Sequence, residues 1–315
     1  MEALLVKELG YSAAKAFGVR AGGSISQGQG FEVDGGRRIF VKQNGKSEAK
    51  GMFQGELEGL EALQRTGCVR VPKPLKVFEL PDGGAAIAFD FVEMHPLKSA
   101  SGSLGENLAR LHLHNSSSRH SRGPLLEQQG SDDAGDSSPL VASFGFHAVT
   151  CCGYLPQDNT WTDDWPTFYT NRRLQTQIDR IVREQPDSEM GDHWLRLLPK
   201  MPHFFHGLDI FPSLLHGDLW SGNAAQTAGG DPVVFDPAAV YGHHEFDLAI
   251  STMFGSLGRP FYTAYHQLIP KADGFDTRQK LYQLYHYLNH YNHFGAGYRG
   301  SCLRLMAELC TVSLP

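Results

Sequence analysis

One stretch decides the fold, Leu214-Leu215-His216-Gly217-Asp218-Leu219-Trp220-Ser221-Gly222-Asn223, followed by Val233-Val234-Phe235-Asp236-Pro237-Ala238. The apolar residues 214–215 and 233–235 are typical of buried strands, and the segment between them, ending in Gly229-Gly230-Asp231-Pro232, is typical of a hairpin turn. Asp218 and Asn223 are therefore predicted on a loop, with Asp236 directly after the returning strand.

The polar residues of this stretch have the order that phosphoryl transfer requires. One carboxylate, Asp218, can accept the proton of an attacking hydroxyl, while Asn223 and Asp236 can hold the Mg²⁺ that neutralises the phosphates. Asp, four residues, Asn, and then Asp after a strand is also the order of the kinase catalytic loop and its metal aspartate. Because Asp and Asn are equally common in ordinary turns, the interpretation depends on the rest of the chain.

The bulk composition is that of a globular protein. The 315 residues are 41% apolar and 20% charged, and this length suits two domains or one two-lobed unit. A net charge of −6 provides no general attraction to nucleic acid or to an anionic membrane, and no apolar run approaches the ~18 residues of a membrane span. Five cysteines without zinc-site spacing and an N-terminus without a targeting signal predict a cytoplasmic protein with reduced thiols.

The N-terminal part carries a glycine-rich stretch, residues 21–30, which includes Gly23 and Ser24 and matches neither common phosphate-loop pattern. A hairpin signal at Asp34-Gly35-Gly36 follows it, and the next strand ends in Val41-Lys42. In kinase small lobes a glycine-rich loop covers ATP and a strand lysine contacts its phosphates. The stretch with Gly23 and Ser24 is therefore a candidate ATP-covering loop, and Lys42 a candidate phosphate contact.

A partner for Lys42 is expected on the following helix, predicted at residues 47–64. Glu56 is the charged residue inside the apolar stripe of that helix. A charge in such a place is costly unless it is paired. We therefore predict an ion pair between Lys42 and Glu56, as in the lysine–glutamate pair of kinases.

Two further strands, residues 75–80 and 85–91, complete a small lobe at residues 1–92. Its fifth strand is expected in the glycine-rich stretch. Asp90-Phe91-Val92 would be the hinge, where the backbone of Asp90 and Val92 can bind an adenine edge.

The remaining residues, 93–315, are predicted to form a larger and mainly helical lobe. A helix is expected to begin with a capping box at Ser103, and residues 116–139, rich in Ser, Gly, Asp and Gln, are expected to form a mobile loop. The aromatic and acidic segment 150–170 is typical of core, with a sugar-binding face as the alternative. The predicted fold class is α+β and two-lobed, with a small, mostly antiparallel N-lobe containing one helix.

Taken together, these residues resemble the fructosamine-3-kinase / ketosamine-3-kinase family, in the aminoglycoside-phosphotransferase-like branch of the protein-kinase fold. The resemblance extends from Leu4 to about Gly300. Its most specific segments are residues 149–153, 163–166, 215–223, 235–238 and 287–290.

The resemblance implies a two-lobed fold and ATP-dependent, Mg²⁺-dependent phosphorylation of a ketosamine at O3. In that family the phosphorylated adduct is unstable and the sugar leaves the amine, which amounts to deglycation. The implied partners are ketoamine small molecules and glycated lysines on proteins, with no nucleic acid and no membrane, and with a monomer or weak dimer as the oligomeric state.

The family's functional residues carry over one by one. Asp218 is similar to the catalytic base, and Trp220 to a substrate-side residue whose ring stacks on a sugar face. The matching metal ligands are Asn223 and Asp236, and the phosphate-holding pair is Lys42 with Glu56.

The chain departs from close family members at Ser24, where they carry a cysteine, so the sequence leaves open whether a thiol-linked dimer or redox switch carries over. Two other functions remain as alternatives. One is an alcohol kinase of the aminoglycoside or choline phosphotransferase type, and the other is a catalytically inactive nucleotide-binding module. The sequence leaves open which of fructosamine, ribulosamine or psicosamine is preferred, because these sugars differ by one carbon or by one hydroxyl's configuration.

Overall fold

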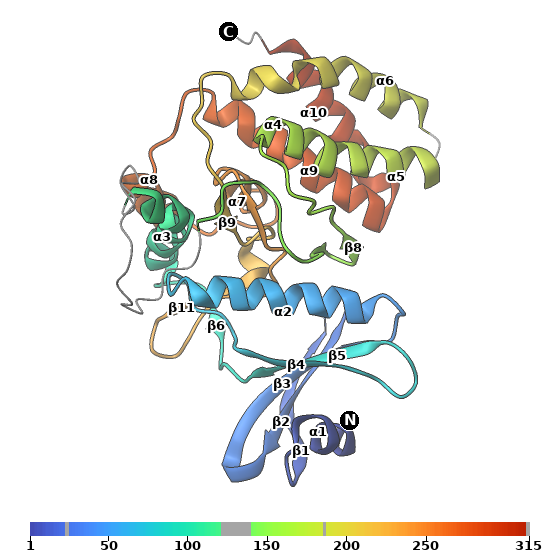
Figure 1. Cartoon of the computed structure of the whole chain (residues 1–315), viewed down its shortest axis with the longest axis vertical. Coiled ribbons are helices and arrows are strands. Elements are labelled where there is room, and N and C mark those ends of the chain that lie inside the picture. The colour runs from blue at the N-terminus through green and yellow to red at the C-terminus, as the bar shows by residue number, and fades with distance from the viewer. Residues whose placement is uncertain (23–24, 121–139, 185–186, 313–315) are drawn as a thin grey trace, which may run out of the picture.

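The computed structural model describes residues 1–22, 25–120, 140–184 and 187–312. An antiparallel sheet forms the N-terminal part, and a larger, mainly helical part follows it (Figure 1). Helix α2 (Ala49–Arg65) lies between the sheet and the helical part. This arrangement confirms the predicted α+β class.

The N-terminal sheet has the strand order β1-β2-β3-β5-β4, and all its pairings are antiparallel. Its strands are β1 (Ala14–Gly22), β2 (Gln27–Val33), β3 (Arg37–Asn44), β4 (Pro74–Glu79) and β5 (Ala85–Asp90). The predicted turn at residues 34–36 joins β2 to β3. The fifth strand, however, begins at Ala14, upstream of the glycine-rich stretch, whose described residues contribute only the end of β1 and the start of β2.

Helices cover both faces of this sheet. Helix α1 (Glu2–Leu9) inserts Leu5 into a small core with Phe31 and Ile39, because its apolar residues recur along one face. Helix α2 packs its buried side against β4 and β5 and against the C-terminal part. This second core joins the two parts of the molecule.

The C-terminal part is built around α9 (Phe275–Phe294), a helix of 20 residues. Its core is rich in aromatic side chains. No helix in the described ranges combines the length and apolar composition of a membrane span. The other helices are α3 (Ser101–His120), α4 (Trp165–Phe168), α5 (Thr176–Glu184), α6 (Ser188–Leu197), α7 (Phe246–Ile250), α8 (Arg259–Leu268) and α10 (Arg299–Thr311). The helices of other types are the π-helix η2 (Tyr169–Gln175) and the 3-10 helices η3 (Leu198–Phe205) and η5 (Ala296–Tyr298).

Helix α3 corrects two predictions. It begins at Ser101 rather than at Ser103, and it runs to His120, so residues 116–120 are helical rather than part of a loop. The Asn115 side chain donates to the carbonyls of Val141 and Pro212, and these tertiary bonds support a segment whose composition alone favours a loop. Residues 121–139 of the predicted mobile loop lie outside the described residues.

The aromatic and acidic segment 150–170 belongs mainly to the core. Trp165, Phe168 and Tyr169 are buried, and Asp164 caps α4 by accepting from the N–H of Thr167 at 2.8 Å. The adjacent acid, Asp163, accepts from the hydroxyl of Ser143. These contacts give the segment a structural role.

Residues 213–242 contain four short strands, but these strands pair differently from the prediction. The glycine-rich turn joins β10 (Ala224–Gln226) to β11 (Pro232–Val234), whereas β9 (Ser213–Leu215) pairs with β12 (Val240–Gly242). The remaining short elements are β6 (His95–Pro96), β7 (Cys151–Cys152), β8 (Leu155–Pro156) and η4 (Ser221–Asn223).

Candidate active site

Two loops meet at the candidate site, one after β9 and one after β11, and backbone bonds hold them together. The N–H of Ala238 donates to the carbonyl of His216 at 2.8 Å, and the N–H of Phe235 donates to the carbonyl of Asn223 at 3.1 Å. The His216 ring reinforces this link, with Nε2 3.0 Å from the Phe235 carbonyl oxygen. The three polar residues predicted to act together are therefore positioned by one connected backbone frame.

The backbone at this frame has two unusual residues. Gly217 has φ 82°, and a Cβ there would lie 2.1 Å from the carbonyl oxygen of Ala238, so the close approach of the loops requires glycine. Among the described residues, Asp236 is the only non-glycine residue with positive φ, at 57°. Residues in this sparsely populated region are frequent at functional sites.

Asp247 holds the backbone of the loop after β9, a role that the sequence did not predict. Its buried carboxylate accepts from the N–H of His216 at 2.7 Å and from the N–H of Gly217 at 2.6 Å, while the His112 ring approaches at 3.2 Å. Burial opposes the charge of Asp247, but the His112 contact and the backbone donors outweigh it and lower its pKa. The only signal in the sequence is an acid at the start of an apolar helix, which also suits an ordinary helix N-terminus.

The Asp218 side chain is partly exposed. Its surroundings nevertheless disfavour the charged form of the carboxylate. Burial, followed by the nearby Asp236 carboxylate, raises its pKa to about 7, and a hydrogen bond from Asn223 opposes the rise. Asn223 Nδ2 lies 3.0 Å from Asp218 Oδ2 and 2.9 Å from its backbone oxygen. A carboxylate with a pKa near 7 has the properties of a general base at neutral pH.

The predicted ion pair between Lys42 and Glu56 is confirmed. Lys42 Nζ lies 2.8 and 2.9 Å from the two Glu56 oxygens, and 3.0 Å from Asp236 Oδ1. Burial alone would lower the pKa of Lys42, but the carboxylates of Asp236 and Glu56 raise it above its usual range. Lys42 thus remains charged and connects β3, helix α2 and the loop after β11.

Asn223 and Asp236 have the donor atoms of a Mg²⁺ site. Asn223 uses its amide nitrogen on Asp218, which leaves its amide oxygen as a possible ligand, and the Asp236 side chain is 45% exposed. Mg²⁺ prefers such oxygen ligands, usually one or two from the protein together with waters and phosphates. The residues present therefore fit this ion.

The predicted hinge residues differ in their environments. The N–H of Asp90 donates to the carbonyl of Lys73 at 2.9 Å, and the N–H of Phe91 donates to the carbonyl of Arg38 at 3.1 Å. The Asp90 carboxylate pairs with Arg37. Within the described ranges, the N–H of Val92 has no backbone carbonyl as acceptor. Of the two backbone N–H groups, that of Asp90 is thus used within the sheet, and that of Val92 is the one available to an adenine edge.

The remaining predicted residues are Trp220, Gly23 and Ser24. Trp220 is half-buried and meets Phe254 edge-on, with ring centroids 6.4 Å apart, and Phe254 in turn stacks on His290 at 4.4 Å. This aromatic row was not predicted, because its members come from distant segments. Gly23 and Ser24 lie outside the described residues.

The chain has clear relatives among known proteins. The family model described as fructosamine kinase matches residues 3–123 and 138–311. Ketosamine-3-kinase from Mus musculus is 48% identical over 312 residues, which cover 98% of this chain and 99% of that protein.

Solved structures show the same fold. A candidate fructosamine-3-kinase from Thermobifida fusca has a TM-score of 0.77 at 28% identity, covering 99% of both chains. A thermostable mutant of aminoglycoside phosphotransferase APH(4)-Ia has a TM-score of 0.61 at 14% identity, covering 99% of this chain and 100% of that one. The fold is therefore that of the aminoglycoside-phosphotransferase-like kinases.

Proposed function

The chain belongs to the fructosamine kinase family, and from this premise we propose that it is an ATP-dependent kinase that phosphorylates O3 of ketosamines. The observation that carries the proposal is the meeting of Asp218, whose pKa is raised to about 7, with Asn223, Asp236 and the Lys42–Glu56 pair. A phosphate ester at O3 destabilises the adduct, so the sugar leaves and the amine is restored.

Each residue of the site has one task in this reaction. Asp218 accepts the proton of the O3 hydroxyl while the oxygen forms a bond to the γ-phosphorus and the bond to the departing ADP oxygen breaks. Lys42 holds the phosphates of ATP, and Glu56 keeps the Lys42 ammonium in place. Mg²⁺, when bound by Asn223 and Asp236, supplies charge neutralisation at the phosphates.

We assign the acceptor side to Trp220 and the adenine side to the hinge. The exposed part of the Trp220 ring offers a flat apolar face, on which the apolar face of a sugar can stack. The Val92 N–H is the proposed adenine contact, and Gly23 and Ser24 are proposed to cover the phosphates. The substrates would be both free ketoamines and glycated lysines on proteins.

The proposal extends to compartment and assembly. Cys152 and Cys302 are buried free thiols, which suits a reducing compartment, and we propose a cytoplasmic enzyme that is a monomer or weak dimer.

The test is ATP consumption by the purified protein with fructosyl-, ribulosyl- and psicosyl-lysine, and with an aminoglycoside. We expect turnover on at least one ketosamine. Asp218→Asn should reduce it by about 10²- to 10⁴-fold, the usual contribution of a general base, while AMP-PNP binds within a few-fold of the parent value. Asp82→Asn, in an exposed turn of the N-terminal sheet, is the matched control and should keep the parent rate.

Three outcomes would contradict the proposal. Near-normal turnover by the Asp218→Asn variant would remove Asp218 as the base. Activity on the aminoglycoside alone would point to an alcohol kinase of another specificity, and nucleotide binding without any turnover would point to an inactive binding module.

A further inference from the structure

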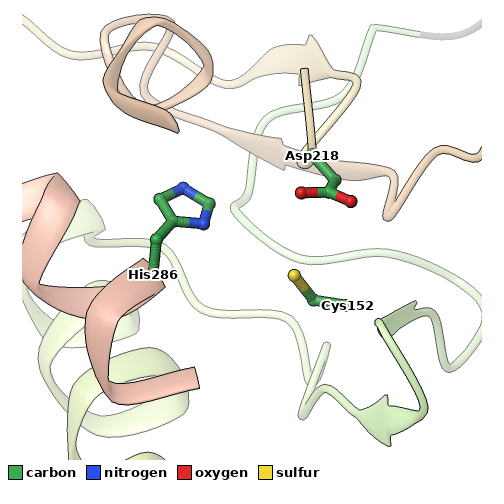
Figure 2. A group of neighbouring side chains, drawn as sticks. All are labelled: Cys152, Asp218 and His286. Carbon is green, nitrogen blue, oxygen red and sulfur yellow. The ribbon is translucent and has the colours of Figure 1, made fainter. Parts of the chain in front are cut away.

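A second set of ligating atoms, separate from Lys42, Glu56, Asn223 and Asp236, converges on Asp218. Cys152 at the end of β7 and His286 on α9 both approach it, and the sulfur, a ring nitrogen and a carboxylate oxygen all lie within 4.8 Å of one another. Figure 2 shows the three side chains pointing toward a common point from three separate segments of the chain.

His286 is the unexplained member of this group. Its side chain is fully buried, yet neither ring nitrogen has a hydrogen-bond partner among the described residues. Buried polar atoms are nearly always satisfied, and an exception calls for a ligand or a function. The ring packs against Phe246 and Tyr285, with centroids 5.2 and 5.1 Å away, and these contacts hold it in place. Burial lowers the pKa of His286 to about 3, which keeps the imidazole neutral and its lone pair free.

Cys152 is held in place as well. It is buried, and its sulfur accepts from Asn289 Nδ2 at 3.2 Å. Its neighbour Cys151 is less buried and does not belong to the cluster. The thiols of Cys151 and Cys152 are adjacent in sequence, but only that of Cys152 belongs to the cluster.

The donor set selects a particular class of ion. A thiolate, an imidazole and a carboxylate are ligands of Zn²⁺, and three protein ligands with one open position are the usual pattern of an accessible zinc site. Bond lengths of about 2.0–2.3 Å place tetrahedral ligands roughly 3.3–3.6 Å apart, and since the three atoms lie within 4.8 Å of one another, a contraction of at most about 1.5 Å forms the site. The oxygen ligands Asn223 and Asp236 suit Mg²⁺ instead.

We propose that Cys152, His286 and Asp218 form an inhibitory site for Zn²⁺. Binding releases the thiol proton of Cys152 to solvent and forms bonds from the sulfur, one His286 nitrogen and one Asp218 oxygen to the ion. The carboxylate that would accept the O3 proton is then occupied. Inhibition is therefore competitive with the sugar acceptor and not with ATP. The inhibitory consequence rests on the proposed function, whereas metal binding itself does not.

Binding is tested with Co²⁺, whose absorption reports a bound thiolate, on the nucleotide-free protein under a non-thiol reductant. We expect a sulfur-to-cobalt charge-transfer band that Zn²⁺ abolishes by displacement. Cys152→Ser should remove the band, and His286→Gln should weaken Co²⁺ binding at least tenfold. Cys151→Ser is the matched control and should keep both band and affinity.

The functional arm uses zinc-buffered kinase assays, with each variant compared with its own zinc-free rate. Zn²⁺ should raise the apparent KM for the acceptor, a chelator should restore the rate, and Cys152→Ser should be at least tenfold less sensitive than Cys151→Ser. A Co²⁺ complex without the thiolate band, or equal zinc sensitivity of the two serine variants, would overturn the site. A thiolate band in a protein that phosphorylates no ketosamine would support the metal site and reject the proposed function.

Discussion

At the scale of single residues, the site depends on charged side chains, such as Asp218 and Lys42, whose charged forms are disfavoured by burial. Asp218 is the clearest case, because burial and the Asp236 carboxylate raise its pKa to about 7. A raised carboxyl pKa favours the protonated form, and a protonated base cannot accept the O3 proton. The ionisation of Asp218 should therefore control the rate near neutral pH.

This argument predicts a pH profile. We expect kcat/KM for the ketosamine to rise with pH and to level off above about pH 7, falling about tenfold per pH unit below it. The profile is measured from pH 5 to 9 at saturating Mg-ATP, with nucleotide affinity followed in parallel. A flat profile between pH 5 and 7, with unchanged ATP affinity, would mean that another group is the base.

Lys42 provides a second prediction at this scale. Lys42→Ala leaves the buried Glu56 without its partner, which should cost about 3–5 kcal/mol of unfolding free energy, and it should also raise KM for ATP. Lys50→Ala is the control, because its ion pair with Glu79 is exposed and should contribute less than about 1 kcal/mol.

A double variant separates the two effects of Lys42. Glu56→Gln added to Lys42→Ala should restore much of the stability in urea unfolding but none of the ATP affinity. If ATP use is also restored, Lys42 makes no phosphate contact.

At the scale of elements, the close approach of helix α2 to the C-terminal part determines where Glu56 lies. Gly55 is the point of closest approach, since a Cβ there would lie 2.2 Å from the carbonyl oxygen of Val149. Gly59, one turn later, faces Ala239 and Pro237. At Gly55 a larger side chain requires the helix or the facing backbone to move, whereas at Gly59 the nearest atom, Ala239 Cβ, is 3.0 Å from the Cβ position.

Gly55→Ala should therefore reduce both stability and kcat, because displacement of α2 moves Glu56 away from Lys42. Gly51→Ala on the same helix is the matched control. Nothing lies within 4 Å of the Cβ position there, and alanine should stabilise the helix by up to about 1 kcal/mol. Melting temperature and kcat are the measurements, and equal behaviour of the two variants would show that α2 does not depend on this close approach.

At the scale of the whole molecule, polar contacts among the described residues join the N-terminal sheet and its helix α2 to the C-terminal part. Lys42 meets Asp236, and His147 Nε2 lies 3.0 Å from a Glu58 oxygen. A nucleotide bound to the sheet on one side and to the catalytic loop on the other would add further links. Nucleotide binding should therefore stabilise the fold as a unit.

We expect AMP-PNP with Mg²⁺ at 100 times its Kd to add about 2.7 kcal/mol to the unfolding free energy. Removing Mg²⁺ with a chelator should reduce this gain, and Asp236→Asn should lose the Mg²⁺-dependent part. The readout is a thermal melt at several nucleotide concentrations, with Lys50→Ala as the control. A gain independent of Mg²⁺ in the parent protein would argue against a metal site at Asn223 and Asp236.

The local elements and much of the proposed chemistry can be predicted from the sequence alone. The turn at residues 34–36, helix α2 and the loop with Asp218 and Asn223 follow from turn chemistry and periodicity, which act over a few residues. Even the Lys42–Glu56 pair could be predicted, because a charge within an apolar stripe needs a partner. The Asp218-to-Asn223 spacing and the aspartate after a strand are similarly local signals.

Which distant segments meet becomes known only from the three-dimensional structure. The pairing of β9 with β12, the support of the catalytic loop by Asp247, and the approach of Cys152 and His286 to Asp218 join residues far apart in the chain. The helical state of residues 116–120 likewise accompanies bonds from Asn115 to remote carbonyls. Such contacts arise from how whole elements pack, and no window of neighbouring residues contains that information.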